Sequence, residues 1–168
     1  MHKLLRILKH RWLDEGDVRR LLGADLVPRV QAHVAASERT HTGEVRVSIE
    51  AGLPLSYLWR GATARERAIA LFGKLRVWDT EHNNGVLIYL LLAERRIEIV
   101  ADRGISRRVP AHAWEDISQE LAAALRAGDC LRGLLQAVDR VGALLTQHWP
   151  ADRSQPNPNE LPDAPDLR

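Results

Sequence analysis

Side chains that carry oxygen flank the apolar runs in the middle of this sequence, and their types are the ones best suited to chemistry. Carboxylate, carboxamide and loop carbonyl oxygens are ligands of hard cations such as calcium and magnesium, and a neighbouring glycine lets the backbone turn in as a further ligand. The residues that could form such a divalent-cation site are Glu44, Asp79, Asn84 and Asp102, with Thr42 and Asn83 beside them.

A purely structural interpretation of the same residues is also open. The Asn-Asn-Gly sequence at 83–85 has the composition of a tight turn at the start of a strand. Asp102 could form an ion pair with Arg103 or Arg107. Under this interpretation the polar residues shape the end of a sheet and bind no ion.

Other catalytic patterns have less support in the sequence. His41 and His82 are the histidines nearest the candidate site, and each could act as a general base or lie in a solvated loop. A phosphate-binding glycine loop, a nucleophile elbow and a paired metal-ligand helix motif are all missing from the sequence. The single cysteine, Cys130, cannot form an internal disulfide and is expected to be a small buried hydrophobe.

The elements that position these residues centre on Val86–Ala93, an apolar run rich in branched side chains. Such a run is typical of a strand covered on both faces. Ile97–Ala101 follows after a turn at Glu94 and Arg95, which is too short for a crossover, so the two runs should form an antiparallel hairpin. That turn places Gly85 opposite Gly104 and Leu87 opposite Asp102, so the flanking polar residues meet at one end of the sheet.

A second strand is predicted upstream. Glu44–Glu50 alternates apolar and polar residues, which predicts a strand with one buried face. Leu53–Gly61 is expected to be a loop, and Thr63–Glu66 fits a capping box at the start of a helix of about fifteen residues. Because strand–helix–strand crossovers are right-handed, Glu44–Glu50 should run parallel to Val86–Ala93.

Helical spacing predicts the remaining elements. Lys3–Trp12 is a short basic amphipathic helix, and further helices end at Gly23 and begin near Pro28, Pro110 and Asp129. The predicted fold class is α/β: a three-layer α/β/α sandwich with a mixed sheet of three to four strands, plus N-terminal helices. We expect an N-terminal helical extension over 1–25, the domain over 26–149 and a disordered Pro-rich tail over 150–168, which holds five of the eight prolines.

Composition restricts the class of protein. The chain has 168 residues, 45% of them hydrophobic, which suits one domain with its own core. A net charge of +2 without a basic stripe argues against nucleic acid as a partner. No apolar run is long enough to span a bilayer and the N-terminus does not resemble a signal peptide, so we expect a cytoplasmic location.

Several segments in a fixed order resemble one known family. They are Thr42-Gly-Glu-Val-Arg-Val, a helix, Asn84-Gly-Val-Leu-Ile, Arg96-Ile-Glu-Ile-Val-Ala-Asp-Arg-Gly-Ile105, Gly128-Asp and a final helix with Gly133. Over about residues 30–148 the sequence is similar to the TPM domain family, named for proteins of the thylakoid lumen and of photosystem II repair and for a worm receptor-associated protein. Many members have Asp-Asn-Gly where this chain has 83–85, and Gly-Tyr-Gly where it has 102–104.

The resemblance implies an α/β/α sandwich, cation binding in some members and an acid phosphatase activity claimed for plant members. Two functional hypotheses follow. In the first, the chain is a cytoplasmic binding or assembly module with a protein partner, a possible calcium or magnesium site and at most weak peripheral membrane contact through the N-terminal helix. In the second, it is a divalent-cation-dependent acid phosphatase in which the ion polarises a phosphoryl oxygen.

Overall fold

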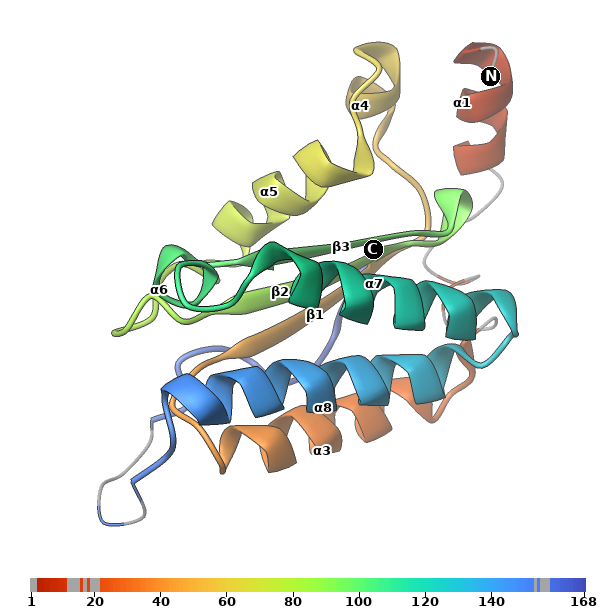
Figure 1. Ribbon diagram of the computed structural model, residues 1–168. Helices are drawn as coiled ribbons and strands as arrows, with labels where there is room; N and C mark the ends of the chain where they lie inside the picture. Colours follow the sequence, from red (N-terminus) through yellow and green to blue (C-terminus); the bar gives the residue numbers. More distant parts are fainter. Residues whose placement is uncertain (1–2, 12–15, 17, 19–21, 153, 155–157) are drawn as a thin grey trace.

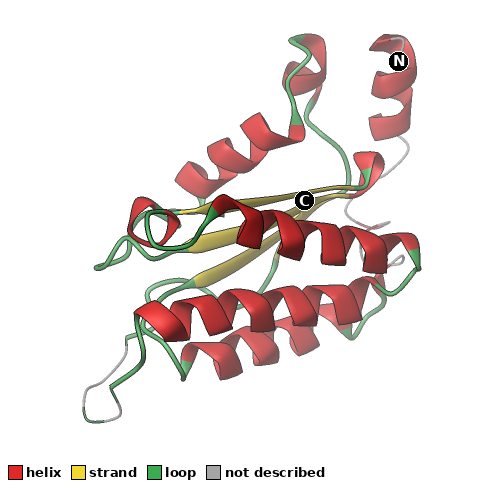
Figure 2. Ribbon diagram, in the orientation of Figure 1, coloured by secondary structure: helices red, strands yellow, loops and turns green. Residues whose placement is uncertain are grey.

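The structure is a computed structural model that describes residues 3–11, 16, 18, 22–152, 154 and 158–168. It is a three-layer α/β/α sandwich built on a mixed four-stranded sheet (Figures 1 and 2). The elements in chain order are α1 (Lys3–Arg11), α3 (Leu26–Glu38), β1 (Val45–Glu50), α4 (Leu55–Trp59), α5 (Ala64–Lys74), β2 (Val86–Leu91), the 3-10 turn η1 (Leu92–Glu94), β3 (Arg96–Ala101), α6 (Arg103–Ser106), α7 (Ala111–Arg126), α8 (Cys130–His148) and β4 (Asp166–Leu167). The expected short helix that ends at Gly23 lies mostly outside the described residues.

The sheet has the strand order β3-β2-β1-β4. β1 runs parallel to β2 with Val45 opposite Val86, and β2 pairs antiparallel with β3, with Val86 opposite Ala101. Both predicted pairings are therefore confirmed. All six residues of β2 are buried, as expected for an apolar strand between two helical layers.

The predicted register of the hairpin is wrong by two residues. The chain leaves β2 through η1, and Arg95 then takes a left-handed conformation with φ 51°, so the loop is longer than the two-residue turn that we expected. Gly85 consequently lies opposite Asp102, whose N–H donates to the Gly85 carbonyl at 2.9 Å. A shift of two residues keeps every side chain on its predicted face of the sheet, because the period of a strand is two.

The core has two parts, one on each face of the sheet. Helices α3, α7 and α8 cover the face that carries Val45, Val47 and Ile49. Helices α4 and α5 cover the other face, where Leu87 and Tyr89 of β2 are buried (Figure 1). Alternate residues of β2 thus enter each core, which fixes the sheet between the two layers.

Two predictions about β1 and the C-terminal tail are wrong. β1 is buried along its whole length, including Arg46 and Ser48, which we expected to face solvent. The cover comes from residues 158–168, expected to be disordered and here called the C-terminal segment. This segment includes β4, which pairs parallel with β1, and it buries Leu161.

The helices between β1 and β2 differ from the prediction in number and in length. The expected loop Leu53–Gly61 contains the short helix α4. The predicted capping box is confirmed, because the Thr63 hydroxyl accepts the Glu66 N–H and the Glu66 carboxylate accepts the Thr63 N–H. Helix α5 ends at Lys74, since Arg76 adopts a positive φ of 56°, and Trp78 is left exposed.

Candidate functional site

Asn84 and Asp102 lie at the same end of the β2–β3 hairpin, Asn84 shortly before β2 and Asp102 directly after β3. Asn84 is fully buried and Asp102 is 7% exposed. Asp102 caps α6, because its Oδ1 accepts the Arg103 N–H at 2.6 Å. Among the described residues, both amide atoms of Asn84 and the Oδ2 of Asp102 are buried without a hydrogen-bond partner. Buried polar atoms of this kind need a water, an ion or a ligand to offset the loss of hydration.

Two glycines, Gly85 and Gly104, allow backbone segments to pack closely at this end of the sheet. The Gly104 N–H donates to the Asn83 carbonyl at 2.9 Å, and a Cβ at Gly104 would lie only 2.4 Å from that oxygen. A Cβ at Gly85 would lie 2.0 Å from the Val77 carbonyl oxygen. The turn at 83–85 therefore has the structural role that the alternative interpretation proposed, while Asn84 and Asp102 keep oxygens without partners.

Glu44 performs a different task from the one predicted. It is 2% exposed, and its carboxylate accepts the backbone N–H groups of Glu160 and Leu161, both at 3.2 Å. Burial raises the pKa of Glu44 to about 7, from an ordinary value of 4.5. Its oxygens are used to hold the C-terminal segment and are not directed at the hairpin end.

Asp79 is also unsuited to the predicted site. Its side chain is about half exposed and lies 3.9 Å from the guanidinium of Arg76, in the turn after α5. In the part of the chain that the structure describes, no three His, Cys, Asp or Glu residues are placed to hold a metal ion together. The structure thus places Asn84 and Asp102 at one end of the hairpin, while Glu44 and Asp79 make other contacts.

The other candidate residues near the hairpin end are His41, His82 and Thr42. His41 is fully buried, with Nδ1 2.8 Å from the Gly43 carbonyl and Nε2 3.1 Å from the Ser37 hydroxyl. Burial lowers the pKa of His41 to about 4, so it is neutral at physiological pH. His82 is exposed, and the Thr42 N–H donates to the Trp149 carbonyl.

Sequence reasoning missed a second group of polar residues, which we call the β1 edge site: Glu44, Arg46 and Ser48. The Arg46 guanidinium donates to the carbonyl oxygens of Pro162 and Ala164. The Ser48 hydroxyl donates to the Asp166 carboxylate at 2.8 Å. Alternation along β1 marked these positions as solvent-facing, and only a scan for a complementary distant segment could have found their role.

The backbone of β1 completes this contact. The Arg168 N–H donates to the Ile49 carbonyl at 3.0 Å, and the Ala51 N–H donates to the Arg168 carbonyl at 2.7 Å. The edge of the sheet beside β1 is therefore filled by an extended segment of the same chain.

Carboxylates surround the start of this contact. Glu38 accepts the Val45 N–H at 2.9 Å, and burial raises its pKa to about 8, with smaller contributions from Glu44 and Asp163. A cavity of about 820 Å³ beside these residues is also lined by Asp152. Protonation of Glu38 and Glu44 thus favours the packed arrangement.

We predict that the free energy of unfolding falls as the pH rises through the range in which Glu38 and Glu44 lose their protons. The pKa values of Glu38 and Glu44 are raised above their ordinary value of 4.5, so their contribution is complete below that pH and is lost as pH rises through about 7 to 8. Urea unfolding across this range should give a falling midpoint. Glu38→Gln should flatten the decline, whereas Glu115→Gln, on the exposed face of α7, should not; an unchanged slope in Glu38→Gln would contradict the assignment.

We also predict that calcium binds weakly at the hairpin end. Of the two buried residues with unpartnered oxygens there, Asp102 is charged and Asn84 is not, and calcium affinity rises with the number of charged ligands and the rigidity of the site. A titration followed by the amide chemical shifts of Asn84 and Asp102 should give a dissociation constant weaker than about 10⁻⁵ M. Tighter binding that is abolished by Asp102→Asn would show an intact cation site.

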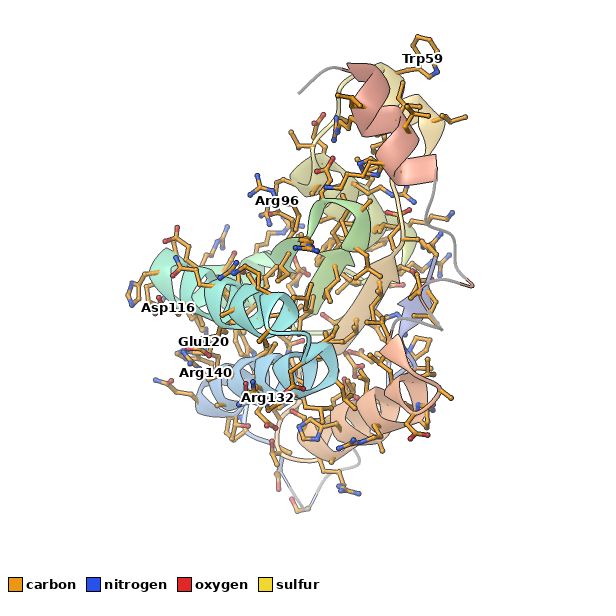
Figure 3. All side chains as sticks on the ribbon, turned by 90° about the vertical axis from the view of Figure 1, so that its right-hand side faces the viewer. Trp59, Arg96, Asp116, Glu120, Arg132 and Arg140 are labelled. Carbon is orange, nitrogen blue, oxygen red and sulfur yellow. The ribbon has the colours of Figure 1, made fainter. Side chains whose placement is uncertain are left out.

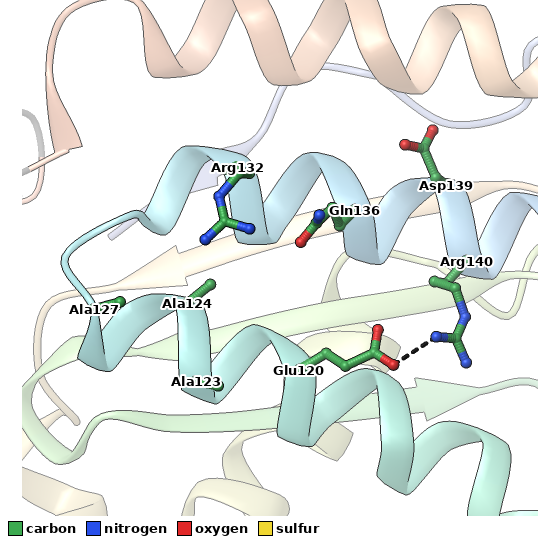
Figure 4. Close-up of a pocket in the computed structure, with 8 residues that line it drawn as sticks. All are labelled: Glu120, Ala123, Ala124, Ala127, Arg132, Gln136, Asp139 and Arg140. Carbon is green, nitrogen blue, oxygen red and sulfur yellow. Dashed lines mark hydrogen bonds and ion pairs between the residues drawn. The ribbon is translucent and has the colours of Figure 1, made fainter.

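The surface hollow between α7 and α8 offers no second site. It has a volume of about 620 Å³ and is lined by the residues drawn in Figure 4. Arg140 pairs with Glu120 at 2.6 Å, as the dashed line in Figure 4 marks. Arg132 pairs with Asp129, and Asp139 pairs with His33, so these charges stabilise the helical layer.

The fold and the hairpin end define the class: a mixed-sheet α/β/α domain with polar residues where β2 begins and β3 ends. The family model of the TPM domain matches residues 17–144, and the chain belongs to the TPM domain family. The solved structures include a similar one, the NMR structure of the BA42 protein from the psychrophilic bacterium Bizionia argentinensis. It superposes with a TM-score of 0.74 at 23% identity, over 86% of this chain and 93% of that one. No curated protein matches the chain.

Proposed function

We propose that this TPM domain is a protein-binding module that holds an extended peptide segment along β1. The observation that carries the proposal is the capture of the C-terminal segment by the β1 edge site. In this view the segment occupies in cis the place that an extended segment of a partner protein takes in trans. We further propose that the module acts in the assembly of a cytoplasmic complex.

The contacts at the β1 edge site are mainly to backbone atoms. Glu44 accepts two backbone N–H groups, Arg46 donates to two backbone carbonyls, and β1 adds two backbone hydrogen bonds. Backbone contacts of this kind give affinity for an extended chain, and side chains at individual positions give specificity, as in other proteins that bind a peptide by adding a strand to a sheet. Ser48 adds a preference for an acidic or polar residue at the position of Asp166.

The β1 edge site holds the C-terminal segment with buried charged side chains, whereas apolar side chains would hold a permanent strand at a lower desolvation cost. Arg46 is 8% exposed and its Nε has no hydrogen-bond partner among the described residues, so a different occupant could satisfy a donor that the C-terminal segment leaves unused. The segment itself pairs through only two residues of β4 and buries the side chains of Leu161 and Pro165. A pairing this short allows the C-terminal segment to detach from β1 without unfolding of the domain.

The phosphatase hypothesis receives no comparable support. It needs Glu44 and Asp79 as metal ligands, and Glu44 is engaged by the C-terminal segment while Asp79 is half exposed beside Arg76. Weak cation binding at Asn84 and Asp102 is compatible with the binding module and would serve to satisfy the buried oxygens of the hairpin end.

The test uses the full chain with its own segment weakened by Leu161→Asp and Asp166→Ala, which leave the β1 edge site intact. A fluorescent peptide of residues 158–168 is titrated into this variant and into the wild-type chain, and binding is followed by fluorescence polarisation. A tethered segment competes at an effective concentration of about millimolar, so the variant should bind the peptide at least about tenfold more tightly.

A peptide that carries the same two substitutions is the matched control and should bind neither chain. Circular dichroism and the urea midpoint establish that the variant is folded. A folded variant that fails to bind the unaltered peptide, or that binds both peptides equally, would overturn the proposal.

A further inference from the structure

Four of the six large apolar residues that are exposed in the described part of the chain lie on two neighbouring helices. Leu5 and Leu8 of α1 are 59% and 55% exposed, and Leu55 and Trp59 of α4 are 45% and 65% exposed. The two helices lie side by side at one end of the molecule (Figure 1), with Trp59 at its extremity (Figure 3). We call these four residues the α1–α4 tip.

Helix α1 is fixed to the domain by polar contacts and by Ile7, which packs against the core, so Leu5 and Leu8 are held outward. The Arg6 guanidinium lies 2.7 Å from the Glu94 carboxylate and donates to the Ala62 carbonyl. His10 is buried, and its Nδ1 accepts the Leu53 N–H at 2.9 Å. Helix α1 therefore packs on the domain through these contacts.

The tautomer of His10 follows from these contacts. Because Nδ1 accepts a hydrogen bond, Nε2 carries the proton and donates to Glu94 at 2.9 Å. Burial lowers the pKa of His10 and so favours the neutral ring. The charge of Glu94 is meanwhile offset by Arg6, which leaves the docked face of α1 without a net negative charge.

Exposed cations border the tip. Lys9 on α1 is exposed, and Arg60, the residue after α4, is exposed beside Tyr57 with its guanidinium 4.4 Å from the ring centroid. Neither α1 nor α4 contains an aspartate or glutamate. Apolar side chains bordered by cations, with a tryptophan at the outer end, match the chemistry of a membrane interface better than that of a typical protein surface.

We propose that the α1–α4 tip binds the surface of membranes that contain anionic phospholipid. Leu5, Leu8 and Trp59 enter the headgroup region, while Lys9 and Arg60 contact phosphate or carboxylate groups. This contact is independent of the β1 edge site, so a membrane-bound chain keeps that site for its peptide. The association is weak and salt-sensitive, because few apolar residues enter and surface charges are screened.

The experiment measures co-sedimentation of the full chain with vesicles of phosphatidylcholine alone and of phosphatidylcholine with phosphatidylserine. Binding is expected only to the vesicles that contain phosphatidylserine, and it should fall as salt is raised. Trp59→Ser should weaken it about tenfold or more. Trp78→Ser is the matched control, because Trp78 is also exposed, at 51%, but lies after α5 and away from the tip.

A second variant tests the charges. Lys9→Gln with Arg60→Gln should weaken binding roughly fivefold for each cation removed and reduce its salt dependence. Equal binding to both kinds of vesicle, no binding to either, or equal effects of Trp59→Ser and Trp78→Ser would overturn the proposal. Sedimentation velocity without lipid tests whether a second copy of the chain binds the tip instead. Self-association of the wild type that is abolished by Trp59→Ser would make the tip an interface between copies and would also overturn the membrane proposal.

Discussion

Replacing Arg67 with methionine is expected to lower the free energy of unfolding by about 3–5 kcal/mol. The Arg67 side chain on α5 donates two hydrogen bonds to the Glu50 carboxylate, from Nε to Oε2 at 2.9 Å and from Nη2 to Oε1 at 2.6 Å. The Tyr89 hydroxyl donates to the same carboxylate at 2.6 Å. Since Glu50 is 3% exposed, removal of Arg67 leaves a buried charge without its counter-ion.

Urea unfolding measures this loss, and Arg140→Ala provides the control. Arg140 also pairs with a carboxylate at 2.6 Å, that of Glu120, but both side chains are about half exposed, so this substitution should cost no more than about 1 kcal/mol. Combining Arg67→Met with Glu50→Gln should recover part of the loss, because the uncompensated charge is removed. Equal effects of Arg67→Met and Arg140→Ala would contradict the account of this network.

Gly85→Ala is expected to destabilise the protein by about 1–3 kcal/mol, because the added methyl group has no space. Its Cβ would lie 2.0 Å from the Val77 carbonyl oxygen and 3.0 Å from a Val77 methyl carbon. The backbone at the start of β2 would have to move, and with it the turn that holds Asn84. Thermal or urea unfolding measures the effect.

Gly73→Ala is the control for this prediction. A Cβ at Gly73 meets nothing within 4 Å, and the residue lies within α5, so alanine should be neutral or add up to about 1 kcal/mol through its better helix propensity. A Gly85→Ala protein as stable as the wild type would show that the hairpin end is looser than the contacts imply.

The centre of the fold could be predicted because its signals are local. An apolar run at Val86–Leu91 and a connection too short for a crossover together determine a buried strand and an antiparallel neighbour. The exact register could not be predicted, since it depends on how Leu92 leaves the strand. That residue begins a 3-10 turn, which the sequence alone does not distinguish from one more strand residue.

The candidate site was predicted in part, for a related reason. Asn84 and Asp102 come together because the hairpin brings their strands together, which the sequence predicts. The contacts of Glu44 could not be predicted, because its partners, Glu160 and Leu161, lie more than a hundred residues away in a segment whose composition suggests disorder. Backbone hydrogen bonds and the burial of Leu161 order that segment, and neither leaves a periodic pattern in the sequence.

The most direct test of the central claim is amide hydrogen exchange of the wild-type chain in the presence of excess unlabelled peptide of residues 158–168. If the β1 edge site exchanges one extended segment for another, the Leu161 and Arg168 amides of the protein should exchange faster as peptide is added, because both are protected by contacts at this site. The Ala51 amide should stay protected, since the peptide takes the same place. Unchanged exchange of Leu161 and Arg168 at every peptide concentration would show that the C-terminal segment is a permanent strand and would contradict the account.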